Sequence, residues 1–403
     1  NKVNKDLAIS NTWSANEEQE IMFGTANGES MVIDPKEEYK TGPSQLTPRP
    51  AQVLALQALK KTIEDDYDKA LVVLATGLGK TYLAAFFAEQ FKRVLFIAHR
   101  EEILYQAKNS FLHVHPNQSA GMYNAVEKNV HADFIFASIH TLSQQYHLDQ
   151  FSPNDFDLIV VDEFHHAAAP SYERVIEYFN PKFLLGITAT PDRLDNKDVY
   201  SICDGNVAIR IPFIDAIERD WLAPFRYYGV YDETDYSQIR WLGNRYDEDE
   251  LARFQLREEM AKKILEAWKL RKQSKTIGFC SSVRQANFLS NYFSGAGYNS
   301  VALSGATPRE ERINARKELE NGLLDIIFTV DLFNEGVDIP TVDTLLFIRP
   351  TESVAVFTQQ IGRGLRLADG KTHCVIIDLI GNYRNADTKL SIFSAEQMDK
   401  PNL

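Results

Sequence analysis

The feature that most constrains the fold is an alternation of short apolar runs with helical segments, which begins after Arg49. Each run is rich in Val, Ile, Leu and Phe along its whole length, as are strands buried on both faces of a parallel sheet. Strands separated by helices imply right-handed crossovers and a doubly wound sheet. The expected strands are Ala70–Ala75, Val94–Ala98, Asp133–Ala137, Leu158–Val161 and Phe183–Ile187.

A second series of the same kind follows a helix expected at 248–272. Pro308 is well placed to open one of the helices between its strands. The sequence therefore predicts two α/β lobes of similar plan, one after the other. The expected strands are Thr276–Phe279, Ser300–Leu303, Asp325–Thr329, Thr344–Ile348 and Val375–Asp378.

The stretches outside these series set the expected domain limits. Residues 1–45 are polar and irregular and are predicted to form an extension or linker, with a short strand near Ser30–Ile33. The aromatic-rich stretch 211–254 is expected to be a connector whose rings pack between the lobes rather than stack on bases. The predicted domains are an N-terminal extension 1–45, a first lobe 46–210, a connector 211–254, a second lobe 255–390 and a tail 391–403.

Composition excludes several classes of protein. The 403 residues are 44% hydrophobic and 25% charged, unlike a disordered chain, a collagen or a small disulfide scaffold. No apolar run approaches the roughly 20 residues that a bilayer span needs. The three cysteines, Cys203, Cys280 and Cys374, are far apart and include no Cys-x-x-Cys pair, so we expect reduced thiols in a cytoplasmic protein.

The charge balance limits how the chain meets nucleic acid. With 43 Lys and Arg against 56 Asp and Glu, the net charge is −13. A protein that coats nucleic acid by bulk charge needs a basic face, so this class is disfavoured. A motor that holds a strand through a few placed donors remains compatible with this charge.

The segment Leu74-Ala75-Thr76-Gly77-Leu78-Gly79-Lys80-Thr81 lies between a predicted strand and an apolar helix, the context of a phosphate-binding loop. Glycines let backbone N–H groups turn toward phosphate oxygens at a helix N-terminus. Lys80 is expected to bridge the β- and γ-phosphates of ATP, and the Thr81 hydroxyl to ligate Mg²⁺. Leu74 departs from the motif, which has glycine there. The predicted nucleotide-binding residues are Thr76, Gly77, Gly79, Lys80 and Thr81.

Two carboxylates follow the buried strand at Leu158–Val161. An α/β sheet presents its ligands at the carboxyl ends of its strands. Asp162 is therefore predicted to hold Mg²⁺, and Glu163 to orient and deprotonate the attacking water. The neighbouring His165 and His166 lack a third ligand at a suitable spacing, so coupling of the nucleotide to the motor is favoured over metal binding.

An arginine cluster lies in the second lobe, at Gln359-Gln360-Ile361-Gly362-Arg363-Gly364-Leu365-Arg366. Arginines brought from another lobe onto a γ-phosphate stabilise developing charge, an effect worth about 10³–10⁵ in rate. Arg363 and Arg366 are therefore predicted to act in catalysis, although a helix end with surface arginines is about equally compatible with this segment alone.

Together these segments resemble, in order, the motifs of a superfamily 2 helicase or translocase with a DExH-type second motif and two RecA-like lobes around an ATP cleft. The further segments that carry the resemblance are Arg49-Pro50-Ala51-Gln52, Ile97-Ala98-His99-Arg100-Glu101, Ser138-Ile139-His140-Thr141, Thr188-Ala189-Thr190-Pro191, Phe279-Cys280-Ser281 and Thr329 to Asp338.

The resemblance implies further roles. Gln52 matches the adenine-reading glutamine, and Gly336 and Asp338 would line the cleft near the ribose and the γ-phosphate. Residues that would couple nucleotide to strand are His165, Thr188, Thr190 and Gln359. Residues that would contact the tracking strand are His99, Arg100, Ser138, Thr141, Cys280, Ser281 and Thr329. Taken singly, Thr141 and Ser281 are also compatible with simple helix N-caps.

The strings at 162–166 and 361–366 are more similar to the type III restriction and excision-repair branch than to RNA-directed DEAD-box proteins. The implied function is an ATP- and Mg²⁺-dependent DNA helicase or translocase in repair, restriction or phage defence. Alternatives are an RNA helicase, the motor module of a multi-subunit nuclease, and a nucleotide-gated scaffold. The run Val375 to Tyr383 resembles a subgroup fused to phospholipase-D-like nucleases, but no His-x-Lys segment occurs, so a nuclease would lie outside this chain or on a partner.

Overall fold

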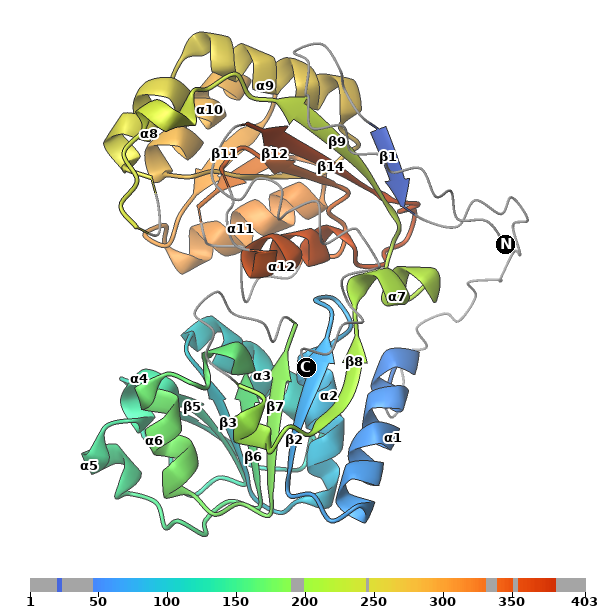
Figure 1. Cartoon of the computed structure of the whole chain (residues 1–403), viewed down its shortest axis with the longest axis vertical. Helices are drawn as coiled ribbons and strands as arrows, with labels where there is room; N and C mark the ends of the chain where they lie inside the picture. Colours follow the sequence, from blue (N-terminus) through green and yellow to red (C-terminus); the bar gives the residue numbers. More distant parts are fainter. Residues whose placement is uncertain are drawn as a thin grey trace.

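The structure is a computed structural model that describes residues 20–23, 46–189, 199–243, 246–330, 339–350 and 354–381. The described residues form two lobes, each built on a seven-stranded sheet, and Figure 1 shows the lobes one above the other. The predicted fold class, two tandem α/β lobes with doubly wound sheets, is confirmed.

The sheet of the first lobe is parallel throughout, with the order β4-β5-β3-β6-β7-β2-β8. Side chains of β2 alternate between two cores, because successive residues of a strand face opposite sides. Val72 and Leu74 pack with α1, α2 and α3, whereas Leu71 and Val73 pack with α4 and α6. The strands are β2 (Lys69–Leu74), β3 (Val94–Ala98), β4 (Ala120–Tyr123), β5 (Phe134–Ser138), β6 (Leu158–Asp162), β7 (Phe183–Thr188) and β8 (Val207–Ile211). The helices are α1 (Pro50–Glu64), α2 (Lys80–Phe87), α3 (Glu101–Val114), α4 (Ile139–Leu142), α5 (Gln145–Leu148) and α6 (Pro170–Tyr178), with short 3-10 turns η1 (Ala88–Gln90), η2 (Phe164–His166) and η3 (Ser201–Cys203).

The sheet of the second lobe has the order β1-β9-β14-β13-β10-β12-β11 and is parallel except for β1, which runs antiparallel to β9. The helix expected at 248–272 is two helices, α8 and α9, which are separated at Leu256 and Arg257. The strands are β1 (Glu20–Phe23), β9 (Phe225–Tyr231), β10 (Thr276–Phe279), β11 (Ser300–Leu303), β12 (Ile326–Thr329), β13 (Thr344–Phe347) and β14 (Cys374–Ile380). The helices are α8 (Glu248–Gln255), α9 (Glu258–Arg271), α10 (Val283–Gly295), α11 (Arg309–Glu320) and α12 (Val354–Gly364).

The stretch expected as a connector belongs partly to the second lobe. Its strand β9 pairs with β14 inside the second sheet. Not all of its aromatic rings pack between the lobes as expected: Tyr236 and Tyr246 form a small separate core with Leu251 of α8, and Trp241 packs against it. The strand expected near Ser30–Ile33 lies outside the described residues.

The two lobes contact each other directly. Helix α7 (Phe213–Glu218) lies between them in Figure 1, and Ala223 N donates a 2.7 Å hydrogen bond to Leu365 O beyond α12. Arg312 of α11 forms a 3.4 Å ion pair with Glu102 of α3. One buried core cluster contains residues of both sheets, such as Val72 of β2 and Phe225 of β9, together with Leu222 between α7 and β9. Residues far apart in the sequence therefore meet along the boundary between the lobes.

Candidate active site

The predicted phosphate loop joins β2 to α2. Gly77 has φ +103° and Gly79 has φ +79°, backbone conformations that favour glycine. A Cβ at Gly77 would lie 2.9 Å from the end of the Leu222 side chain, so a larger residue would also have to displace that side chain. Leu74, which replaces the first glycine of the motif, is the last residue of β2, is fully buried and pairs with Ile211. The loop therefore begins after this position, which explains why it needs no glycine.

The amide of Gln52 holds this loop. Its Nε2 donates to Gly79 O at 2.9 Å, and its Oε1 accepts from Arg49 N at 2.8 Å. The side chain is 2% exposed. An amide has a second donor hydrogen and a second acceptor lone pair. The adenine contact implied for Gln52 stays a prediction, and it would use this second donor hydrogen and second acceptor lone pair.

The two carboxylates lie where β6 ends. Asp162 is the last residue of the strand, and its Oδ1 accepts a 3.0 Å hydrogen bond from Glu163 N. Glu163 has φ +50°, in the left-handed region that side-chain-bearing residues rarely adopt. The next residue, Phe164, packs over Gly186, where a Cβ would lie 2.5 Å from its ring. Local packing thus turns the chain sharply directly after Asp162.

The carboxyl of Glu163 is held in its ionised form. Burial alone would raise the pKa of its carboxyl, but the positive charge of Lys80, the hydrogen bond from His165 and the charge of Arg363 lower the pKa to about 2. Glu163 is therefore ionised at neutral pH and can accept a proton. Lys80 and Arg363 come from different lobes, so this carboxylate lies in the field of both.

A polar network surrounds Glu163. His165 Nδ1 lies 3.3 Å from Glu163 Oε2 and 3.1 Å from Thr188 Oγ1. Gln359 Nε2 of α12 donates to the same Glu163 oxygen at 3.4 Å. All four side chains are buried. The structure thus brings together three of the predicted coupling residues around the predicted base.

The arginine segment packs against the phosphate loop. A Cβ at Gly362 would lie 2.4 Å from Thr76 Cβ, so only glycine allows this approach of α12. Burial and then the like charges of Arg49 and Arg316 lower the pKa of Arg366 to about 10. Arg366 therefore keeps its charge at neutral pH in a basic environment, which favours an anion. Gly362 was not among the predicted site residues, and the only sign of its close contact in the sequence is a glycine within the arginine segment.

The residues present fit a phosphate-bound Mg²⁺. This ion prefers oxygen ligands and is bound through one or two carboxylates plus substrate phosphates. Thr81, in the first turn of α2, provides a hydroxyl oxygen, and Asp162, at the end of β6, provides carboxylate oxygens. No group of three or more His, Cys, Asp or Glu side chains in the described part of the chain is placed to hold a metal ion.

The residues expected to contact a nucleic-acid strand differ in exposure to solvent. His99 and Arg100 are half-buried, and Arg100 Nε donates to His99 Nε2 at 3.3 Å. Cys280 and Thr329 are fully buried, because their side chains point into the sheet packing. Burial also raises the pKa of the Cys280 thiol. In this arrangement these two side chains are not accessible to a nucleic-acid strand.

The remaining three expected strand contacts are hydroxyls. Ser138 is the N-cap residue of α4 and Thr141 lies inside that helix, both mostly buried. Ser281 Oγ donates to Oε1 of Gln255, at 2.5 Å, or of Gln285, at 3.0 Å. The N-cap of α10 is Ser282, so the alternative N-cap roles of Thr141 and Ser281 are wrong. Gln255 and Gln285 position Ser281, which sequence patterns did not indicate.

Three predicted residues lie outside the described part of the chain: Thr190, Gly336 and Asp338. The roles implied for them stay predictions.

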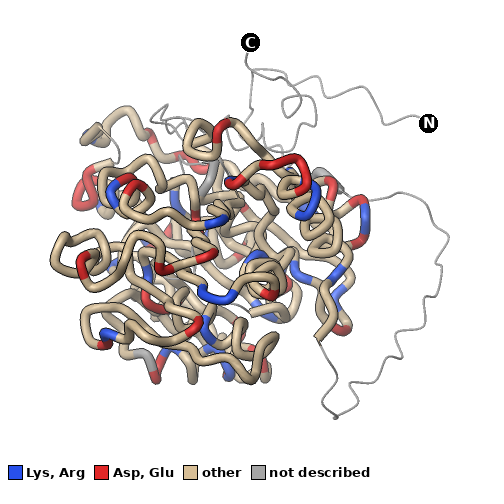
Figure 2. Tube along the Cα trace, turned by 90° about the horizontal axis from the view of Figure 1, so that it is seen from below, with Lys and Arg blue, Asp and Glu red and all other residues tan. Residues whose placement is uncertain are grey.

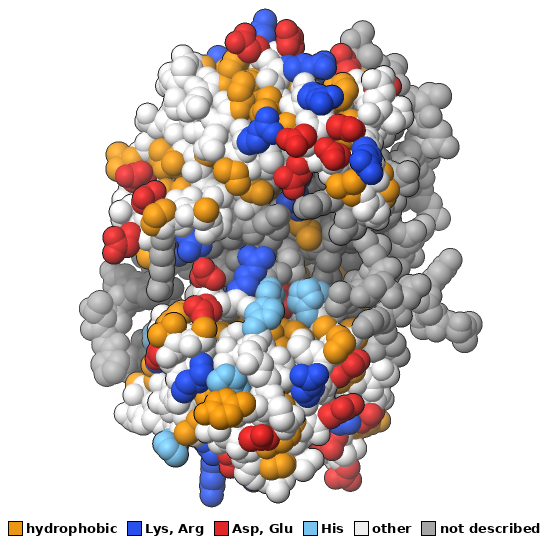
Figure 3. All heavy atoms as spheres, turned by 90° about the vertical axis from the view of Figure 1, so that its left-hand side faces the viewer, with side chains coloured by type: hydrophobic (Ala, Val, Ile, Leu, Met, Phe, Trp, Pro, Cys, Tyr) orange, Lys and Arg blue, Asp and Glu red, His pale blue; other side chains and the backbone are white. Residues whose placement is uncertain are grey.

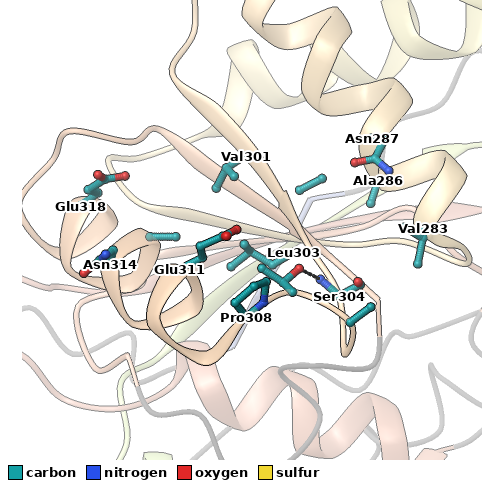
Figure 4. A pocket seen from close by; sticks show the side chains of 14 residues that line it. Val283, Ala286, Asn287, Val301, Leu303, Ser304, Pro308, Glu311, Asn314 and Glu318 are labelled. Carbon is teal, nitrogen blue, oxygen red and sulfur yellow. Dashed lines mark hydrogen bonds between the residues drawn. The ribbon is translucent and has the colours of Figure 1, made fainter.

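The surface is consistent with a site between the lobes. Lys and Arg are interspersed with Asp and Glu along the chain (Figure 2), and on one face histidines lie at the boundary between the lobes, beside both basic and acidic side chains (Figure 3). A cavity of about 530 Å³ lies elsewhere, between α10, β11 and α11 (Figure 4). Its lining includes Val283, Leu303 and Glu311 but no residue of the phosphate loop or of α12, so it is separate from the predicted chemistry.

No helix in the described ranges is long and apolar enough to cross a membrane.

Comparisons with known proteins agree with this geometry. A family model described as Type III restriction enzyme, res subunit, matches residues 45–193, and one described as helicase conserved C-terminal domain matches residues 257–368. The chain is 28% identical over 352 residues to the predicted ATP-dependent helicase IRC3 of Saccharomyces cerevisiae, covering 81% of this chain and 50% of IRC3. It is 30% identical over 372 residues to the predicted mitochondrial ATP-dependent helicase irc3 of Schizosaccharomyces pombe, covering 87% of this chain and 61% of that protein.

A solved structure shares the fold. It is a fragment of a predicted HsdR subunit of a type I restriction enzyme from Vibrio vulnificus, with a TM-score of 0.67 and 24% identity, covering 88% of this chain and 67% of that chain. The two family models fall on the two lobes in order, with the phosphate loop in one and the arginine helix in the other. The chain therefore belongs to the superfamily 2 helicases of the DExH type, a family of ATP-dependent enzymes, in the branch related to restriction enzymes.

Proposed function

We propose that the chain is an ATP-driven DNA motor, a helicase or translocase that hydrolyses ATP in the cleft between its lobes. The observation that carries the proposal is the contact of Glu163 with Gln359, across the boundary, beside the charges of Lys80 and Arg363. We also propose lobe limits of 46–210 and 255–390, with β9 added to the second lobe.

In the proposed reaction the phosphate loop binds the triphosphate, and Lys80 neutralises its β- and γ-oxygens. Thr81 and Asp162 would hold Mg²⁺, which would supply charge neutralisation when bound. Glu163 orients a water molecule and accepts its proton as the oxygen attacks the γ-phosphorus, and ADP leaves. Arg363 and Arg366 stabilise the charge on the transferred group, so hydrolysis depends on contact between the lobes.

DNA is the proposed partner because the first-lobe model is that of a restriction-enzyme subunit. His99 and Arg100, which directly follow β3 and are half-buried, are among the proposed strand contacts. Contacts to a strand through a few hydroxyls and one arginine are compatible with the net charge of −13.

The test is steady-state ATPase of the chain alone and with single-stranded DNA, duplex DNA or RNA, at one stated low salt concentration. Duplex DNA should stimulate turnover strongly. Lys80→Ala should abolish it, whereas Lys60→Ala, a lysine on the exposed face of α1, should not. Stimulation by RNA alone would show an RNA helicase instead, and stimulation by none would contradict the proposed strand contacts.

A second candidate is the motor module of a nuclease assembly, which the restriction-enzyme model over residues 45–193 favours. This candidate predicts ATP turnover without DNA cleavage until a separate nuclease is supplied. Cleavage of plasmid DNA by this chain alone, with ATP and Mg²⁺, would contradict it.

A further inference from the structure

Three histidine rings lie in contact between the base and the proposed strand contacts. The ring centroids of His99 and His166 are 5.1 Å apart, at an interplanar angle of 69°. Those of His165 and His166 are 4.2 Å apart, at 43°. His99 directly follows β3 and the other two belong to η2, directly after β6. Because β3 and β6 are neighbours in the sheet, their carboxyl ends place these rings side by side.

Each end of this row of rings reaches a different part of the proposed machinery. At one end, His165 contacts Glu163 and Thr188. At the other, His99 accepts the hydrogen bond of Arg100. His166, half-buried between the other two rings, is the residue that connects these groups.

We propose that His166 is a positioning residue that transmits strand binding at His99 and Arg100 to Glu163 through ring packing on His165. The inference rests on the proposed function, since it requires that nucleic acid stimulates ATP hydrolysis. A strand that moves Arg100 displaces the ring of His99, and the packed rings pass this shift to the side chain that holds the Glu163 carboxylate. Energetic coupling is carried by such contiguous packed side chains when they have discrete arrangements.

Ring contacts join His166 to both neighbours. Edge-on and tilted aromatic pairs are favourable at such centroid distances. Phenylalanine preserves a ring of similar width, whereas alanine removes it. Comparison of the two substitutions therefore separates ring packing from the polar chemistry of the imidazole.

The experiment measures ATPase of the parental chain, His166→Ala and His166→Phe over a range of duplex DNA concentrations. His166→Ala should keep basal turnover and the DNA concentration for half-maximal stimulation, but lose maximal stimulation by about 5- to 150-fold, the usual range of coupling between sites. His166→Phe should keep stimulation within about twofold, because the ring contacts remain. His131→Ala is the matched control, an exposed histidine of the same lobe whose backbone N–H makes its hydrogen bond to Asn129.

A double-variant cycle adds a second readout. The experiment compares His99→Ala, His166→Ala and the double variant. If His99 acts through His166, the double variant loses no more maximal stimulation than the more impaired of the two single variants. Thermal melting of each variant shows whether it is folded, and the Phe variant tests the proposal even if the Ala variant unfolds.

Several outcomes overturn the inference. If duplex DNA stimulates the ATPase of His166→Ala as strongly as that of the parental chain, transmission through this ring is excluded. If His166→Ala needs more DNA for half-maximal stimulation but reaches the parental maximal ATPase, His166 contacts the DNA strand directly instead. Loss of stimulation in a folded His166→Phe shows that the imidazole nitrogens, not packing, are required. A parental chain that no nucleic acid stimulates overturns the proposed function as well, whereas the other outcomes leave it intact.

Discussion

Gln359 of α12 donates a 3.4 Å hydrogen bond from Nε2 to Oε2 of Glu163, so the second lobe contacts the carboxylate that ends a strand of the first. The two residues are 196 positions apart in the sequence. The same carboxylate oxygen lies 3.3 Å from His165. The position of α12 is therefore linked directly to the proposed base.

Gln359→Ala is expected to lower stimulated ATP turnover roughly tenfold, since a hydrogen bond to a charged group contributes about 1.5 kcal/mol. Gln359→Glu should lower it further, because a like charge then faces Glu163. Gln118→Ala, at an exposed turn, is the control. Equal turnover of both Gln359 variants and the parental chain would show that this contact has no role in hydrolysis.

Gly362→Ala is expected to separate the lobes, because the new Cβ would lie 2.4 Å from Thr76 Cβ. Misplacement by about 1 Å costs roughly 10²-fold in rate, so stimulated turnover should fall by this order. Gly295→Ala, at the end of α10, is the matched control: its Cβ meets nothing within 4 Å. Turnover of Gly362→Ala at the level of this control would contradict the close approach.

The ion pair between Arg312 and Glu102 joins the lobes at 3.4 Å and is partly exposed. Pairs of this kind contribute about 0.2–1 kcal/mol, so Arg312→Glu should lower turnover by roughly 1.5- to 5-fold at low salt. The double swap with Glu102→Arg should restore it, and about 1 M salt should remove the difference by screening. A double swap no better than Arg312→Glu would mean that the pair does not hold the lobes.

Asp157 anchors the starts of β3 and β6. Its Oδ2 accepts from Lys92 N at 3.0 Å and from Arg93 N at 3.3 Å, and Lys182 Nζ lies 2.9 Å from Oδ1. Burial raises the pKa of this carboxyl, but the bonds from Lys182 and the two backbone N–H groups outweigh burial and lower it below its ordinary value.

A lowered carboxyl pKa stabilises the fold above the unfolded pKa of about 3.9, and this stability is lost as pH falls through the folded pKa. Asp157→Asn should therefore lower the free energy of unfolding by about 1 kcal/mol at pH 7 and by less near pH 3. Chemical denaturation at both pH values measures this. An equal loss at the two values would show that the charge of Asp157 is not the cause.

Much of the fold was predictable because buried parallel strands are apolar along their whole length. β3, β10 and β11 have the predicted limits. β4 was missed because it is four residues long and contains Gly121, and β9 because its aromatic residues resemble a connector. β8 was missed because most of its side chains are only partly buried.

The candidate site was predictable where one local segment carries the chemistry, as at Lys80 and Glu163. Its tertiary contacts were not. The amide of Gln52 binds the backbone of Gly79, and the ring of His166 packs on His99, through contacts that depend on how α1 and η2 meet distant segments. The burial of Cys280 follows from its place directly after β10 in a buried core of the second lobe, which a motif match does not reveal.

The most direct test of the account is ATP binding and ATP turnover of Glu163→Gln, measured together in the presence of duplex DNA. Glutamine keeps the shape of the side chain but cannot accept the proton, and general base catalysis contributes about 10²–10⁴-fold. The account predicts that Glu163→Gln binds ATP as the parental chain does and turns it over about 10²–10⁴-fold more slowly. Hydrolysis at the parental rate would contradict the assignment of Glu163 and, with it, the proposed site.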